Sequence, residues 1–427
     1  MVWPRRVPNR HNGAVNLDAS AVERAASDLA GVAVVTPLQF NERLSQRTGG
    51  NVWIKREDLQ PVRSYKIRGA YNLIATLSDA ERSHGVICAS AGNHGQGVAF
   101  ACARLGIKGR IFVPSTTPRQ KRERMLALGN GSIELVIVGD TYDEAAAAAK
   151  AEAARTGAEI VPAFDDPRTI AGQGTLAMEV VAQLGHAPDT FVIPVGGGGM
   201  LAGCLTWLNE RHPEVAVIGV EPAGAACMAA AVMAGGPVDL PRIDTFVDGA
   251  AVRRAGALTS AIARRHRPRL LDVPEGRICS EMLAFYQVDG IITEPAGALA
   301  AAALDAIAPT PGSDVIVVLS GGNNDVSRYA EILERSLVYE GRKHYFLVNF
   351  PQEPGALRRF LDEVLGPDDD ITLFEYVKRS NRETGPALVG IELGNPDDLP
   401  ALLARMAASP MSAEPIDPDG PLYRFLI

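Results

Sequence analysis

The alternation of short apolar runs with helical patterns constrains the fold of this chain more than any other feature. Between about residue 51 and residue 336, β-branched runs alternate with longer helix-prone segments. This rhythm is typical of βαβ units and parallel sheets. The predicted strands are residues 51–55, 86–89, 111–113, 134–138, 191–195, 215–220 and 315–319. Most are continuously apolar, which favours strands that are covered by helices on both faces.

The number of βαβ units predicts more than one α/β lobe. The chain has 427 residues, which is more than one ordinary domain holds. After an irregular arm at residues 1–20, a helix is predicted at residues 21–30, and a second, alanine-rich helix is predicted at residues 141–155. We expect two α/β lobes, with a ligand cleft where the carboxyl ends of parallel strands meet.

Residues 343–427 have a different order of predicted strands and helices. Strands are predicted at residues 343–350, 371–378, 387–393 and 422–427, and helices at residues 354–365 and 397–408. A polar, glycine-containing hairpin loop is expected at residues 379–385. The order βαββαβ is that of a ferredoxin-like module, and the segment has room for one. We therefore predict one domain at residues 1–338 and a second at residues 339–427.

Composition excludes several classes of partner. The net charge of −8 disfavours nucleic acid, because phosphate binding requires clustered Lys and Arg. No apolar run approaches the roughly 20 residues of a membrane span. Residues 1–16 are basic but lack the apolar centre of a secretory signal, so we expect a cytoplasmic protein, with an organelle transit segment as the alternative. The five cysteines and seven histidines are dispersed, which predicts reduced thiols and no metal site.

The glycine run Gly196–Gly199 is a candidate anion site. It follows the predicted strand at residues 191–195 and precedes a helical pattern at residues 200–209. Glycines at such a junction let backbone N–H groups converge on an anion, and the helix dipole adds to the attraction. The run lacks the Lys-Ser/Thr of a nucleotide P-loop and the spacing of a dinucleotide fingerprint. The alternative is a flexible loop with no ligand.

Ser90, Ala91, Gly92 and Asn93 occupy the same kind of position after the strand at residues 86–89. Their N–H groups could bind a carboxylate, and Asn93 could donate to a ring hydroxyl or an oxyanion. The alternative is an ordinary helix N-cap, where Ser and Asn are common. His94 is interpreted as a cap of its own loop rather than as a general base.

Two further segments complete the candidate site. Residues 320–323 end the last predicted strand of the large region, and Ser320 can offer one neutral hydrogen bond. Lys66 lies in the basic segment 64–70 and, taken alone, reads as a solvated lysine. A pyridoxal phosphate enzyme needs an amine for the Schiff base, backbone donors for the phosphate, and partners for the ring hydroxyl and ring nitrogen. Each of these requirements has one candidate in this chain.

The combined motifs closely resemble those of the threonine dehydratases, which are fold-type II pyridoxal phosphate enzymes. The resemblance covers roughly residues 30–336 and rests on residues 55–61, 64–70, 90–97, 196–200, 294–298 and 320–323. It implies a two-lobed catalytic region like that of the tryptophan synthase β chain. The last module resembles the ACT-like regulatory domain of the biosynthetic, isoleucine-sensitive form. That form often carries two such modules, whereas this chain has room for one.

The resemblance implies a role for each candidate residue. Lys66 would be the Schiff-base lysine, Asn93 would bond the ring oxygen of the cofactor, and Ser320 would face its pyridine nitrogen. The phosphate would be held by Gly196, Gly197, Gly198, Gly199 and the amide of Met200. The substrate carboxylate would be held by Ser90, Ala91, Gly92 and Asn93. The chain departs from the pattern in having Tyr65 where phenylalanine is common. Serine racemases have a second serine at the position of Ala91, so its absence argues against racemisation.

The function implied by the resemblance is deamination of L-threonine to 2-oxobutanoate and ammonia, the first committed step of isoleucine biosynthesis. The freed Lys66 amine would take the α-proton of the substrate. Isoleucine, or alternatively valine, would be an allosteric effector, and the assembly would be a homotetramer. The alternatives are a dehydratase that also uses L-serine, a threonine synthase relative, and a non-catalytic amino-acid sensor. The tail could also serve oligomerisation without binding a ligand.

Overall fold

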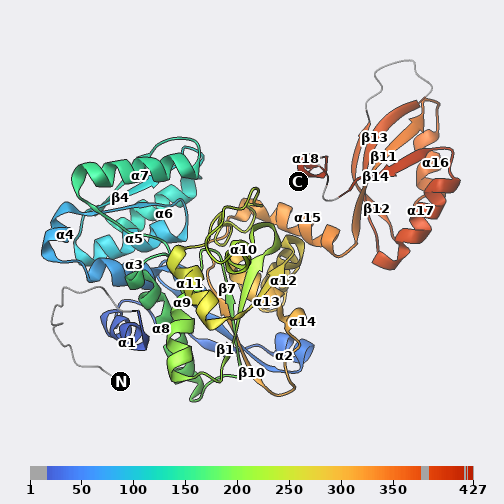
Figure 1. The fold of residues 1–427 in the computed structure, drawn as a ribbon. Helices are drawn as coiled ribbons and strands as arrows, with labels where there is room; N and C mark the ends of the chain where they lie inside the picture. The colour runs from blue at the N-terminus through green and yellow to red at the C-terminus, as the bar shows by residue number, and fades with distance from the viewer. Residues whose placement is uncertain (1–16, 377–383, 418–419, 421, 427) are drawn as a thin grey trace. The chain divides into compact units, whose positions relative to one another are not determined.

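The computed structural model describes residues 17–376, 384–417, 420 and 422–426. The chain divides into two compact units, and Figure 1 shows the helices and strands of the chain. The first unit comprises Met1–Asp272 and Ala296–Asn323, and the second comprises Val273–Pro295 and Asn324–Ile427. The second unit therefore takes in two chain segments that precede residue 339. The predicted domain boundary at residues 338 and 339 stays a prediction.

The larger sheet of the first unit has six strands in the order β1-β2-β10-β7-β8-β9. Its strands are β1 (Leu38–Phe40), β2 (Asn51–Arg56), β7 (Thr190–Pro194), β8 (Ala216–Pro222), β9 (Arg269–Val273) and β10 (Asp314–Leu319). Strands β2, β10, β7 and β8 run parallel, and β1 is antiparallel to β2. The strands predicted in this region are confirmed, whereas β1 and β9 were not predicted from the sequence.

The smaller sheet of the first unit is parallel, in the order β5-β4-β3-β6. Its strands are β3 (Val86–Ala89), β4 (Gly109–Val113), β5 (Ile133–Ile137) and β6 (Glu159–Ile160). Successive side chains of β3 enter different cores, because Cys88 packs with the α3, α5 and α6 side while Ile87 packs with the alanines of α7. Figure 1 shows β4 between α7 and the pair α5 and α6. Burial on both faces explains the continuously apolar runs.

Several helices of the first unit begin at a residue whose side chain caps the helix, among them α1, α2, α4, α7 and α8. Thr141 and Glu144 form a capping box at α7, and the Asp166 carboxylate caps α8. The helices of the first unit are α1 (Ala19–Asp28), α2 (Glu42–Thr48), α3 (Lys66–Ala75), α4 (Asp79–His84), α5 (Asn93–Leu105), α6 (Arg119–Gly129), α7 (Tyr142–Thr156), α8 (Pro167–Leu184), α9 (Gly199–Arg211), α10 (Cys227–Ala234), α11 (Ala257–His266) and α14 (Leu304–Ile307). Helix α13 (Pro295–Ala302) begins at the boundary of the two units.

Helix α8 crosses two other helices with almost no side chain between them. A Cβ added at Gly172 would lie 2.4 Å from the backbone oxygen of Arg68 in α3. A Cβ added at Gly174 would lie 2.6 Å from the backbone oxygen of Gly203 in α9. Only glycine permits such close backbone approach. The residue between these glycines, Gln173, is therefore held where α3, α8 and α9 meet.

The tail of the second unit has the predicted order βαββαβ. Its elements are β11 (Lys343–Pro351), α16 (Ala356–Glu363), β12 (Asp370–Tyr376), β13 (Thr384–Glu392), α17 (Leu399–Ala408) and β14 (Ser412–Pro415). The strands form an antiparallel sheet in the order β12-β13-β11-β14. Helices α12 (Glu275–Gln287) and α15 (Tyr329–Tyr339) belong to the same unit. Residues 377–383, which hold most of the predicted hairpin loop and the end of a predicted strand, lie outside the described residues.

The predicted strand at residues 422–427 is wrong. Tyr423–Leu426 forms the short helix α18, and the fourth strand is β14, which pairs with β11. A short apolar run has the same pattern in a buried strand and in a helix, so periodicity cannot separate the two. Strand β14 is mostly exposed and has no β-branched residue, so it gives no strand signal in the sequence.

Candidate active site

The segment before Lys66 is joined to the segment that follows β10. Ser64 forms an antiparallel bridge with Gly321. The Tyr65 amide donates to the Ser320 carbonyl at 3.1 Å, and the Gly322 amide donates to the Arg63 carbonyl at 2.9 Å. These backbone bonds place the start of α3 at the carboxyl end of β10. Two of the four predicted segments are therefore in direct contact.

Lys66 is the first residue of α3, and its side chain is only partly exposed. Its Nζ atom donates to the Ala163 carbonyl at 3.2 Å and lies 5.2 Å from the centre of the Tyr65 ring. The acceptor is thus a neutral backbone oxygen. An amine held in this way keeps its nitrogen available for covalent or proton-transfer chemistry, as a lysine locked to a carboxylate would not.

Asn93 begins α5 and reaches the same place from the smaller sheet. Its Oδ1 accepts a hydrogen bond of 2.7 Å from Nδ2 of Asn323, which also donates to the Val62 carbonyl at 2.9 Å. One turn further along α5, a Cβ added at Gly97 would lie 3.1 Å from the Lys66 carbonyl. The starts of α3 and α5 therefore touch, and Asn93 is tied to the segment that contains Ser320.

Ser320 is 3% exposed, and its hydroxyl donates to the Ala296 carbonyl at 3.1 Å. No carboxylate is required to satisfy this hydroxyl, since the carbonyl already accepts its proton. A serine hydroxyl can rotate about its C–O bond, so it can exchange this acceptor for a ligand atom. The residue at the end of β10 thus offers a neutral hydrogen bond.

The glycine run follows β7 and leads into α9, whose first residue is Gly199. Gly198 has φ +90, a left-handed conformation that disfavours other residues. A Cβ added at Gly197 would lie 2.3 Å from the Phe164 ring, so the loop has room for backbone alone on that side. The Thr259 hydroxyl donates to the Gly197 carbonyl at 2.7 Å and fixes its direction. The first amides of α9 have no partner within the helix and suit an anion.

Residues 90–92 form the turn between β3 and α5. The Ser90 amide donates to the Phe112 carbonyl at 3.1 Å, and the Gly92 amide lies 3.3 Å from Ser90 Oγ. An added Cβ at Gly92 would meet nothing within 4 Å, so this turn borders open space. The three residues are half-buried. Such a turn can receive a small carboxylate.

The interpretation of His94 as a cap of its own loop is wrong. Its Nε2 lies 2.7 Å from the carbonyl oxygen of Val161, which follows β6. A carbonyl can only accept, so Nε2 carries the hydrogen and Nδ1 is unprotonated. The reason for the difference is that β6 pairs with β3 and brings Val161 beside the start of α5. Burial, assisted by the positive charge of Lys66, lowers the pKa of His94 to about 4, so the ring is neutral at pH 7.

A buried ionic network surrounds Arg68, two residues after Lys66 in α3, and was not predicted from the sequence. Arg68 makes paired bonds to Glu57 at 2.8 Å and to Glu179 at 2.7 and 2.8 Å. Lys55 donates to Glu179 at 2.8 Å and to the Thr36 carbonyl at 2.8 Å. Burial opposes the charge of Arg68, but the two carboxylates raise its pKa above the ordinary value. No local pattern indicates that Arg68 is fully buried while Lys66, two residues earlier, is not.

The glycine run is connected to Lys66 through Gln173. Its Nε2 donates to the same Ala163 carbonyl that accepts from Lys66 Nζ, again at 3.2 Å. Its Oε1 lies against Gly199, because a Cβ there would be 2.3 Å away. All four predicted segments are thus brought together. Together these groups fit the needs of pyridoxal phosphate. They are an amine for the Schiff base, a glycine-rich helix start for the phosphate, an asparagine amide for the ring hydroxyl and a neutral hydroxyl for the ring nitrogen.

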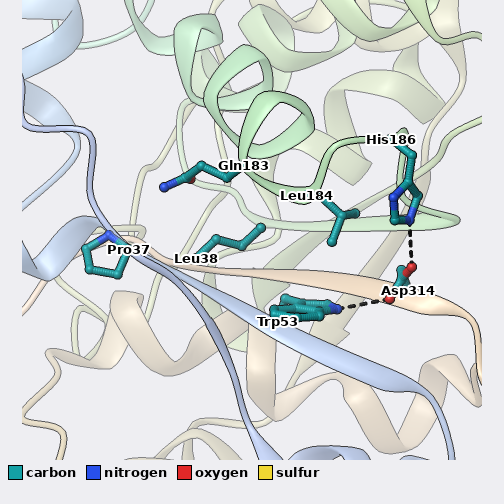
Figure 2. A pocket seen from close by; sticks show the side chains of 7 residues that line it. All are labelled: Pro37, Leu38, Trp53, Gln183, Leu184, His186 and Asp314. Carbon is teal, nitrogen blue, oxygen red and sulfur yellow. Dashed lines mark hydrogen bonds and ion pairs between the residues drawn. The ribbon is translucent and has the colours of Figure 1, made fainter. Parts of the chain in front are cut away.

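The pocket in Figure 2 lies at a different place on the larger sheet. It has a volume of about 520 Å³ and is lined by Pro37, Leu38, Trp53, Gln183, Leu184, His186 and Asp314. Asp314 accepts from Trp53 Nε1 at 2.9 Å and from His186 at 2.8 Å. Asp314 begins β10, whereas Ser320 follows its end. Because parallel sheets bind ligands at the carboxyl ends of their strands, the Lys66 side is the better candidate site.

In the part of the chain that the structure describes, no three His, Cys, Asp or Glu side chains are grouped to hold a metal ion. Within the same residues, none of the helices combines the length and the apolar character needed to cross a bilayer. The five cysteines are free and buried.

Two families match the chain. Residues 30–321 match the pyridoxal-phosphate dependent enzymes, and residues 334–426 match the C-terminal regulatory domain of threonine dehydratase. The chain is 60% identical over 414 residues to the L-threonine dehydratase biosynthetic IlvA of Mycobacterium tuberculosis, covering 96% of each chain. The match begins upstream of Lys66 and ends beyond Ser320, so it includes all four segments of the site.

Solved structures, among them the two that follow, are similar to about three quarters of the chain. The processed form of threonine deaminase isoform 2 from Solanum lycopersicum has a TM-score of 0.70 and 37% identity, over 78% of this chain and 99% of that one. Maize serine racemase has a TM-score of 0.69 and 27% identity, over 75% of this chain and 98% of that one. The predicted fold-type II catalytic region with a regulatory domain, and the dependence on pyridoxal phosphate, are confirmed. The chain therefore belongs to the pyridoxal-phosphate dependent enzymes and, among them, to the biosynthetic threonine dehydratases.

Proposed function

We propose that this enzyme deaminates L-threonine by α,β-elimination and forms 2-oxobutanoate and ammonia. The observation that carries this proposal is the 60% identity to a biosynthetic L-threonine dehydratase over 96% of each chain. The reaction would supply the first committed step of isoleucine biosynthesis. A serine racemase structure is also similar. The resemblance of the motifs implies that serine racemases have a second serine at the position of Ala91, so the proposal remains deamination.

Lys66 is the proposed covalent anchor of the cofactor and the base of the reaction. Bound pyridoxal phosphate supplies an electron sink for the pair that remains on the substrate α-carbon when its C–H bond breaks. The proton of that bond passes to Lys66 Nζ, which lies on the Ala163 carbonyl when it is at rest. The neutral partner leaves the amine able to accept a proton.

The remaining roles are proposed from the resemblance and are supported by the position of each residue in the site. The phosphate is held by the amides of Gly196, Gly197, Gly198, Gly199 and Met200 at the start of α9. Because Asn323 donates to Oδ1 of Asn93, Nδ2 is the atom of Asn93 that would face an acceptor such as the ring oxygen. The turn of Ser90, Ala91, Gly92 and Asn93 holds the substrate carboxylate. Ser320 meets the pyridine nitrogen without adding charge.

The test is to mix purified holoenzyme with L-threonine and to identify the 2-oxo acid. We expect 2-oxobutanoate and an equal amount of ammonia. L-Serine is the matched second substrate, because one methyl group changes transition-state binding by only about 1–3 kcal/mol and both amino acids can react. A preference for serine would favour the broader dehydratase, and no 2-oxo acid from either amino acid would favour a non-catalytic sensor.

We further propose that isoleucine, or alternatively valine, binds the tail at residues 339–427 and inhibits the enzyme. The support is the match of residues 334–426 to a regulatory domain, together with the ferredoxin-like order of its elements. A homotetramer in the cytoplasm is the proposed assembly and location. The five free, buried cysteines suit a reducing compartment.

A further inference from the structure

Gln173 is a buried amide whose two ends face different parts of the site. It is 0% exposed and lies between Gly172 and Gly174, where α8 crosses α3 and α9. Its Nε2 donates to the Ala163 carbonyl, while its Oε1 is buried and has no hydrogen-bond partner. A buried acceptor without a donor lowers the stability of the folded state, so its presence requires an explanation.

The orientation of this amide is fixed by its neighbour. If the amide were reversed, Oε1 would face the Ala163 oxygen and two acceptors would repel each other. Nε2 therefore points to Ala163, and Oε1 lies against the backbone of Gly199. The unsatisfied oxygen is thus part of the site and does not result from a wrong assignment of the amide.

Lys66 and Gln173 share one acceptor. Both nitrogen atoms lie 3.2 Å from the Ala163 oxygen, so they can be no farther apart than twice that distance. Oε1 belongs to the same amide as Nε2, and the flexible four-carbon side chain of lysine can turn toward it. A charged amine has three N–H donors, of which the Ala163 carbonyl takes one. The nearby ring of His94 is neutral: its Nε2 donates to the Val161 carbonyl, and its unprotonated Nδ1 is a second buried acceptor without a partner.

We propose that Gln173 is a positioning residue for Lys66. Its Nε2 fixes the Ala163 carbonyl on which the amine rests, and its Oε1 accepts an N–H bond from the amine when the amine carries the proton taken from the substrate. Gln173 would thereby favour the protonated lysine without a permanent charge. This inference rests on the proposed role of Lys66 as the base, and it adds a residue on α8 to the residues predicted from the sequence.

The test measures the protonation of Lys66 directly. The apoprotein is labelled with acetic anhydride over a range of pH, and the fraction of Lys66 that is acetylated is read by peptide mass spectrometry. In Gln173→Glu, a carboxylate near the amine stabilises its charged form, so the midpoint of labelling should move up by about one pH unit or more. In Gln173→Met, the cation loses an acceptor and the midpoint should move down.

The control is Gln183→Glu, the same substitution on the same helix, about 15 Å farther along its axis. It should leave the Lys66 midpoint unchanged. In the holoenzyme, the acidic limb of the pH profile of kcat should move to higher pH in Gln173→Glu and stay in place in the control.

Unchanged labelling of Lys66 in both Gln173 variants would overturn the proposal. If Gln173→Glu does not fold, Gln173→Met alone decides, and an unchanged midpoint there rejects it. Labelling needs no substrate, so a failure with threonine would reject the proposed function and leave this result standing.

Discussion

At the scale of single residues, the site consists of neutral partners around one amine. Lys66 Nζ and the Ser320 hydroxyl each donate to a backbone carbonyl. Oδ1 of Asn93 accepts from the Asn323 amide. The charged groups nearby are paired with one another in the network of Arg68 and its carboxylates. This arrangement keeps the lysine from being neutralised by a fixed counter-ion.

Replacing Lys66 with alanine should abolish turnover. The substitution removes the amine that is proposed to anchor the cofactor and to accept the α-proton, so kcat should fall by several orders of magnitude, with the visible absorbance of the lysine-bound cofactor lost as well. Absorbance spectra and a 2-oxo acid assay measure both effects. Lys55→Ala removes a different buried lysine and should not remove the absorbance if the protein folds. Full threonine deamination by Lys66→Ala would refute the assignment.

His94 should make the stability of the protein depend on pH. Its folded pKa is about 4, below the value of about 6.5 in an unfolded chain. The unfolded state therefore binds a proton first as the pH falls, and stability should decline between about pH 6.5 and pH 4 by roughly 3 kcal/mol. Above this window the titration of His94 should make no further change to the stability. Urea unfolding of the wild type and of His94→Asn across this range tests the prediction, since the variant should lack this part of the decline.

At the scale of elements, helix starts and close helix crossings build the site. Helices α3, α5 and α9 each begin at a predicted site segment, and α8 fastens two of them through glycines. The strands and their carboxyl ends were predictable, because the apolar runs mark strands that are buried on both faces. The crossing of α8 was not, because the short segment that contains Gln173 has no pattern that separates a helix contact from a binding residue.

Replacing Gly197 with alanine should weaken cofactor binding. The new methyl group would lie 2.3 Å from the Phe164 ring, so the loop at the start of α9 must shift. We expect the Kd for pyridoxal phosphate to rise at least tenfold, which corresponds to about 1.4 kcal/mol. Fluorescence titration of the apoprotein measures this. Gly236→Ala is the matched control, because an added Cβ there meets nothing within 4 Å. Equal affinities in the two variants would contradict the prediction.

At the scale of the whole molecule, one chain joins a catalytic fold to a module with a separate sheet and core. The core of the tail is formed by the residues of β11, β13, α16 and α17 and shares no strand with the sheets of the first unit. A module of this kind can bind an effector of its own. The same helices α12 and α15 that precede the tail are grouped with it, so the second unit is not simply the end of the chain.

Deleting residues 341–427 should remove inhibition by isoleucine. The full chain should show a falling rate with added isoleucine, and the truncated chain should keep its rate at every concentration if it folds. Circular dichroism and cofactor absorbance of the truncated chain provide the control for folding. Equal inhibition of both proteins would place the effector outside the tail. If neither is inhibited, the tail has no isoleucine site and oligomerisation remains its role.

The sequence by itself determined which chemical groups the enzyme can use and where along the chain they stand. Buried strands leave an apolar signature, and the glycine run, Asn93 and Ser320 follow such strands directly. Only the tertiary structure decided what those groups contact. The neutral tautomer of His94, the burial of Arg68 and the shared carbonyl of Lys66 and Gln173 depend on contacts between residues that are distant in the chain. Local patterns record the burial of a strand or helix face, and they carry no information about which distant backbone oxygen a side chain will meet.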